Sequence, residues 1–113
     1  MTEIKDFSAQ ELDMVQQTLK ERYGHNVELE LADVELRLDP IAYELTTCPA
    51  LYWEMSGCHF VISKLGKMRY YAQFYYRGYE QFGTGIREFD DLFDCVTTLL
   101  RVQADHDLMK GQD

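Results

Sequence analysis

The stretch CHFVISKLGKMRYYAQFYYRGY, residues 58–79, decides the expected fold of this chain. It is rich in aromatic and β-branched residues, which is typical of paired strands. It contains five of the eight tyrosines and four basic residues, but no Asp or Glu. Gly66-Lys67 matches a two-residue hairpin turn with glycine in first place. We therefore expect a hairpin of two strands, residues 59–65 and 68–77.

Helical patterns lie on both sides of this region. Ser8 and Glu11 have the spacing of a capping box, and apolar residues then recur at helical spacing until Gly24, a residue that suits a helix end. This predicts a helix over about residues 9–23. A second amphipathic pattern predicts a helix over about residues 90–104. Its expected apolar face consists of Leu92, Phe93, Val96, Leu99 and Leu100, with Cys95 on the same inner side.

Shorter strand patterns fill the region between the first helix and the hairpin. In NVELELADVELRL, residues 26–38, apolar and acidic residues alternate, and the alternation changes parity at Ala32-Asp33. Either a two-residue turn at this point or one long bulged strand accounts for the change. Pro49 marks a break, LYWEM at 51–55 reads as a strand, and Ser56-Gly57 reads as a turn.

Strands that follow one another between two helices predict an α+β fold. We expect an antiparallel sheet of four or five strands with two helices packed on one face, in the order α-β-β-β-β-β-α. A chain of 113 residues is expected to form one domain over residues 1–113, with flexible tails at 1–7 and 106–113.

The charge of the chain limits the classes of partner. The formal net charge is -9, and residues 1–56 carry twelve acidic and four basic side chains. An acidic protein is a poor ligand for nucleic acids or anionic membranes, because both require cationic surface. Three cysteines, no apolar leader and no long apolar run predict a cytoplasmic protein with reduced thiols.

No catalytic or metal-binding motif stands out. The histidines and cysteines do not form CxxC, HxxxH or HExxH spacings, so we expect no metal and no cofactor. Cys58 and His59 are adjacent, and neighbouring strand residues point to opposite faces. The chain is therefore expected not to be an enzyme.

The hairpin supplies the candidate binding surface. With a turn at Gly66-Lys67, one face carries polar and aromatic residues, joined by Phe60 and Ile62, that could bind a protein or form a dimer. These candidate contact residues are Lys64, Arg69, Tyr71, Gln73, Tyr75 and Arg77. The opposite face, expected to meet the helices, carries Val61, Leu65, Met68, Tyr70, Ala72, Phe74 and Tyr76.

The turn at Ser56-Gly57 leaves the exposure of this surface open. A two-residue turn places Leu51, Trp53 and Met55 beside Phe60 and Ile62, which would make the tyrosine-rich face part of the core. A three-residue loop that includes Cys58 places them on the opposite face.

Two classes of function follow from these patterns. The first is a non-catalytic protein–protein interaction module of the adaptor, inhibitor or immunity type, or a homodimer formed through the Tyr/Arg-rich sheet face. The alternative is a small-molecule-binding domain or small enzyme with a pocket between sheet and helices. Its expected site residues are Arg69, Tyr71, Tyr75 and His59.

Overall fold

The computed structural model describes residues 4–38, 41, 44–76 and 81–110. Its elements are α1 (Ala9–Tyr23), β1 (Glu30–Leu36), β2 (Thr46–Met55), β3 (Cys58–Gly66), β4 (Arg69–Tyr75), β5 (Gln81–Gly83) and α2 (Leu92–Lys110). The strands form one antiparallel sheet in the order β1-β2-β3-β4-β5. The predicted α+β fold and its element order are confirmed.

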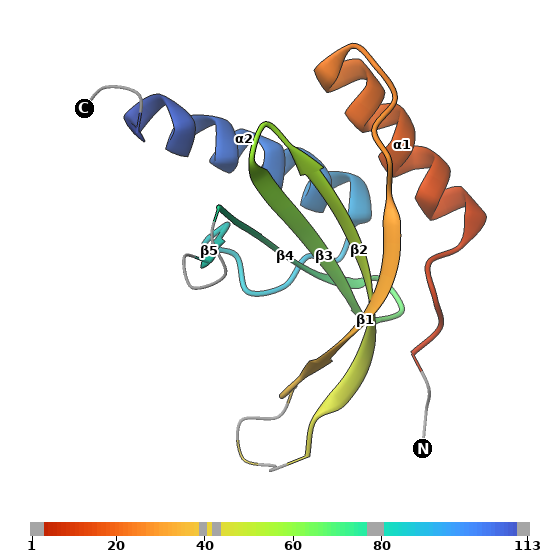
Figure 1. The fold of residues 1–113 in the computed structure, drawn as a ribbon. Helices are drawn as coiled ribbons and strands as arrows, with labels where there is room; N and C mark the ends of the chain where they lie inside the picture. The colour runs from red at the N-terminus through yellow and green to blue at the C-terminus, as the bar shows by residue number, and fades with distance from the viewer. Residues whose placement is uncertain (1–3, 39–40, 42–43, 77–80, 111–113) are drawn as a thin grey trace.

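The two helices cover one face of the sheet. Figure 1 shows α2 crossing behind β2 and β3, and α2 contacts β4 and α1. The core lies between these layers and includes Trp53, Phe60 and Phe74, each at most 1% exposed. The lower ends of β1 and β2 extend beyond both helices. We call the sheet face turned away from the helices the open face.

The sequence signals at both ends of α1 act as predicted. The Ser8 hydroxyl accepts a hydrogen bond from the Glu11 N–H at 3.1 Å, and a Glu11 carboxylate oxygen accepts one from the Ser8 N–H at 2.8 Å. Gly24 ends the helix in the left-handed conformation, with φ 80°. Val15 and Leu19 are fully buried, so the helical spacing of apolar residues identified the inner face.

The second helix differs from its prediction in length and in one core residue. It continues to Lys110, beyond the expected end at Ala104, because its last turns are tied to the sheet. The Tyr76 hydroxyl donates to Asp107 at 2.5 Å, and the His106 ring lies 4.4 Å from that of Phe82. Phe93, assigned to the apolar face, is 54% exposed.

Among the described residues, no helix is both long enough and apolar enough to span a membrane.

The first strand runs through the predicted parity change without a turn. Its register with β2 is continuous from Glu30 opposite Tyr52 to Leu36 opposite Thr46, so the hairpin interpretation is wrong. Pro49 lies inside β2, where the β3 ladder has not yet begun. A proline is tolerated there because its missing N–H removes no hydrogen bond from the sheet.

A two-residue turn at Ser56-Gly57 fixes the register of β2 and β3. Ser56 has φ 54° and Gly57 has φ 80°, as in the turn type that matches the twist of a hairpin. Met55 therefore pairs with Cys58, and Trp53 pairs with Phe60. Their rings stack at 5.1 Å on the helix side.

This turn predicts opposite effects of two substitutions. Ser56→Asn is expected to raise the free energy of unfolding by about 0.5 kcal/mol, because Asn adopts positive φ more readily than Ser. Gly57→Ala is expected to lower it by about 1 kcal/mol through backbone strain. A Cβ at Gly57 would meet no atom within 4 Å, so steric contact adds nothing. Urea unfolding measures both changes, and a loss of stability in Ser56→Asn would contradict the turn assignment.

The next turn lies one residue later than predicted. Gly66 pairs with Arg69, so the turn residues are Lys67 and Met68, and Met68 has φ 57°. The register shifts between Lys64 and Gly66, which is a β-bulge. Because one extra residue reverses the facing of a strand, Phe60 and Ile62 lie on the helix side with Ala72 and Phe74, not beside Tyr71.

Candidate functional site

The open face of the sheet carries a group of partly exposed aromatic and polar side chains. Alternation along β4 turns Tyr70, Ala72 and Phe74 toward the helices and the residues between them outward. The strand register adds residues from β2 and β3 to the same face. Its central members are Tyr52, Glu54, His59, Val61, Tyr71, Gln73 and Tyr75.

The structure brings together four of the six predicted contact residues. Arg69, Tyr71, Gln73 and Tyr75 lie on the open face, with Arg69 exposed and the other three half-buried. Arg77 lies outside the described residues. The same placement turns Tyr71, Tyr75 and His59 away from the helices, whereas Arg69 also borders a hollow between the start of α1 and the β3–β4 turn.

Lys64 is the predicted contact residue that the structure places elsewhere. It pairs with Tyr70 on the helix side and is 8% exposed. Its Nζ donates to Glu11 Oε1 at 2.8 Å and to the Asp6 carbonyl at 3.1 Å. The β-bulge explains the error, because it inverts the facing of the residues that precede the turn.

A row of three stacked rings crosses the end of the open face near the β2–β3 turn. The His59 ring lies 4.8 Å from the Tyr75 ring at 11°, and 5.8 Å from the Tyr52 ring at 24°. The Tyr52 hydroxyl and His59 Nδ1 are 2.5 Å apart and hydrogen-bonded. Glu54 Oε2 lies 3.4 Å from His59 Nε2. Contacts on both ring nitrogens and on both ring faces hold His59 in one orientation.

This row is better suited to binding than to nucleophilic attack. Partial burial, with the nearby Tyr75 and Glu54, raises the pKa of Tyr52, so its phenol stays protonated. Cys58, the neighbour of His59, is 1% exposed and faces the helices. A thiol on the other side of the sheet is out of reach of the imidazole. The remaining property of the row is a rigid, flat aromatic surface, which is typical of contact sites.

Three arginines gather at the opposite end of the open face. Arg37, Arg69 and Arg87 line one hollow of about 430 Å³ together with Tyr71 and Glu88. Arg69 Nε and Nη2 donate to the two Glu88 carboxylate oxygens at 3.0 and 2.9 Å. These hydrogen bonds raise the pKa of Arg69 and lower that of Glu88.

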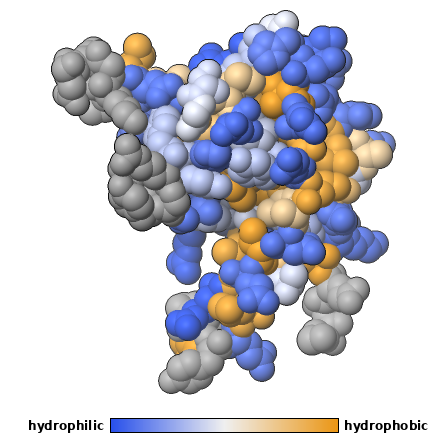
Figure 2. Space-filling model, in the orientation of Figure 1, coloured by the Kyte–Doolittle hydropathy of each residue, from blue (hydrophilic) through white to orange (hydrophobic). Residues whose placement is uncertain are grey.

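The open face therefore carries negative side chains at one end and positive side chains at the other. Glu30 and Glu54 lie at the end where Tyr75 pairs with His59, and the arginines lie at the end where β4 begins. Arg69 and Tyr75 are six residue steps apart along β4, a span of about 20 Å. Figure 2, in which α2 lies at the back, shows a mosaic of hydrophilic and hydrophobic surface on the viewed side.

Sequence reasoning missed several members of this face. Tyr52 and Glu54 could have been assigned from the sequence, because a two-residue turn at Ser56-Gly57 fixes the register of β2 and β3. Strand alternation then gives the side of the sheet that each residue faces. Arg37 and Arg87 carried no local signal. Arg37 directly follows β1, and Arg87 lies in the segment before α2. Only the folded sheet brings the two close to Arg69.

No protein-family model matches the chain, and no curated protein or solved structure is significantly similar to it. Within residues 4–38, 41, 44–76 and 81–110, no group of three or more His, Cys, Asp or Glu side chains is arranged to hold a metal ion.

Proposed function

We propose that this protein is a non-enzymatic, cytoplasmic interaction module that binds a second copy of itself through the open face. The observation that carries the proposal is the distribution of charge on that face, with Glu30 and Glu54 at one end and, beside the Arg69–Glu88 ion pair, Arg37 and Arg87 at the other. Two copies related by a twofold axis across the middle of the face place the Glu54 end of each against the Arg37 and Arg87 end of its partner.

The composition and size of the face support a contact of this kind. Tyrosines stacked with His59 supply large, rigid contact area at a low cost in side-chain entropy. Four full strands make a face about 20 Å wide and about 23 Å long. Two such faces cover roughly 900 Å², near the lower limit for a specific interface, so we expect a dimer with a micromolar dissociation constant.

The three thiols support the cytoplasmic assignment. Cys48, Cys58 and Cys95 are buried as reduced thiols, which suits a reducing compartment. Burial also raises the pKa of the Cys95 thiol to about 12, so it is a core side chain and not a nucleophile.

Charge reversal tests the dimer. Glu54→Lys alone, and Arg37→Glu/Arg87→Glu alone, are each expected to raise the dimer dissociation constant by about 10- to 100-fold, since each creates like-charge contacts across the axis. An equimolar mixture of the two is expected to restore the dimer, because both contacts then join opposite charges. Sedimentation equilibrium from 1 to 500 µM at low salt measures the constants.

The matched control is a pair of charge reversals on the helices, Glu21→Lys and Arg101→Glu, both at exposed positions. Neither is expected to change the dissociation constant more than about twofold. A monomer at 500 µM contradicts the proposal, and so does a mixture of face variants that stays monomeric. A dimer that the helix variants break, and the face variants leave intact, also overturns it.

A further inference from the structure

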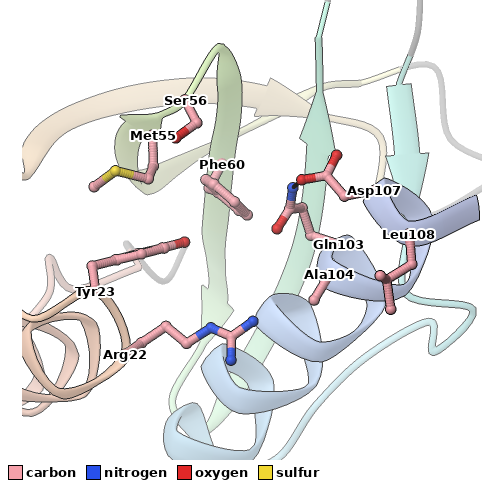
Figure 3. A pocket seen from close by; sticks show the side chains of 9 residues that line it. All are labelled: Arg22, Tyr23, Met55, Ser56, Phe60, Gln103, Ala104, Asp107 and Leu108. Atoms are coloured by element: carbon pink, nitrogen blue, oxygen red, sulfur yellow. Dashed lines mark hydrogen bonds between the residues drawn. The ribbon is translucent and has the colours of Figure 1, made fainter. Parts of the chain in front are cut away.

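A hollow lies on the helix side of the molecule, opposite the open face. It is open to solvent, has a volume of about 460 Å³ and is bordered by the C-terminal parts of α1 and α2 and by the β2–β3 hairpin. Figure 3 shows the side chains that line it: Arg22, Tyr23, Met55, Ser56, Phe60, Gln103, Ala104, Asp107 and Leu108. Volumes of this size accept small organic ligands.

The hollow offers an apolar surface to a ligand. Phe60 is 1% exposed and extends into the view from β3, with Met55 above it. Leu108 borders the hollow from α2 and is 66% exposed. A compact aliphatic or aromatic group placed here would cover the exposed part of Leu108 and of Met55.

Gln103 presents a hydrogen-bond acceptor to the hollow. Its side-chain Nε2 donates to Asp107 Oδ2 at 2.8 Å and to the Tyr76 hydroxyl at 3.2 Å. The opposite amide orientation would place Oε1 against the Asp107 carboxylate, where two acceptors would repel each other. Nε2 therefore faces Asp107, and Oε1 faces away from it. Gln103 is 8% exposed. Figure 3 shows this oxygen directed into the hollow.

Opposite charges stand on two sides of the same space. The Arg22 guanidinium extends toward it from the end of α1, and no described residue accepts a hydrogen bond from it. Asp107 borders it from α2. Burial raises the pKa of Tyr23; the charge of Arg22 counteracts this effect and that of Asp107 adds to it. Arg22 and Asp107 therefore present a positive and a negative group to one hollow.

We infer that this hollow is a binding site for a free apolar α-amino acid. The ligand carboxylate binds the Arg22 guanidinium, and its ammonium group donates to Gln103 Oε1 and to Asp107. Its side chain packs against Phe60, Met55 and Leu108. A free amino acid meets these requirements because it carries both charges on one carbon, next to an apolar group. The site lies on the side of the sheet away from the dimer face, so it does not depend on the proposed dimer.

Isothermal titration calorimetry with L-leucine, L-methionine and L-phenylalanine tests the inference. At least one is expected to bind with a dissociation constant of about 1 mM or lower. Leucinamide and N-acetylleucine, which each lack one charge, are expected to bind at least tenfold more weakly. Absence of saturable binding by all three amino acids up to 10 mM overturns the proposal, as does equal binding of the blocked compounds.

Arg22→Gln is expected to weaken the binding about tenfold, because it removes the carboxylate partner at an exposed position without disturbing the core. The matched control, Lys20→Gln, changes a basic residue in the same helical turn that does not line the hollow. A second variant, Ala104→Phe, places a ring in the hollow and is expected to abolish binding. Unchanged binding in Arg22→Gln or in Ala104→Phe contradicts the assigned site.

Discussion

Replacing Lys64 with methionine is expected to lower the free energy of unfolding by about 3 kcal/mol, since it leaves a largely buried carboxylate without its cation. The Lys64 and Glu11 side chains are only 10% and 17% exposed, and their charged atoms are 2.8 Å apart. Glu11 also accepts a hydrogen bond from the Tyr70 hydroxyl, so the pair joins α1 to both strands of the β3–β4 hairpin. Urea unfolding measures the loss.

The control is the same substitution three residues along the chain. Lys67 is exposed in the β3–β4 turn, and Lys67→Met is expected to change stability by less than about 0.5 kcal/mol. Equal losses in the two variants would contradict a buried ion pair. Glu11→Gln supplies a second measurement, because it keeps the size of the side chain and removes the charge.

Acid is expected to weaken this pair. Partial burial raises the pKa of Glu11, but hydrogen bonds from Lys64, Tyr70 and Ser8 outweigh it and hold the pKa below its ordinary value of 4.5. A carboxyl group whose pKa is lower in the folded state stabilises the fold above about pH 4.5. That stabilisation is lost as the pH falls through the folded-state value. The wild type is therefore expected to lose stability more steeply below pH 4.5 than Glu11→Gln.

Lys64 also shows where sequence reasoning ended. Strand alternation applied to a turn at Gly66-Lys67 places Lys64 outside, and the β-bulge before the turn places it inside. Its carboxylate partner lies 53 positions earlier in the chain. Nothing in the hairpin sequence indicates a buried acceptor, so a lysine at this position is predicted to face solvent. Only the packing of α1 against the hairpin shows that Lys64 is buried.

The predictions that succeeded rest on local physical chemistry. The capping box at Ser8, the stop at Gly24 and the alternation in β4 each depend on residues within a few positions of one another. Phe93 shows the limit of helical periodicity. It is adjacent to Leu92, which is 5% exposed, but spacing alone does not tell how wide the buried stripe of α2 is.

Phe74→Ala is expected to lower the free energy of unfolding by about 4 kcal/mol, which would leave a domain of this size close to unfolding. Phe74 is 1% exposed and lies at the centre of an aromatic cluster that joins the sheet to α2. Its ring centroid lies 5.4 Å from that of Phe82, 5.6 Å from His106, 6.2 Å from Tyr76 and 6.5 Å from Phe60. Urea unfolding is the measurement.

Phe93→Ala removes the same atoms from an exposed position and is expected to cost less than about 0.5 kcal/mol. Phe74→Leu, a milder change that keeps the protein folded, separates the core from the open face. It is expected to cost about 1–2 kcal/mol and to leave the dimer dissociation constant within about twofold. Phe74 faces the helices, whereas its neighbour Tyr75 faces outward, so a large change in the dimer constant would show that the two faces of β4 are not independent.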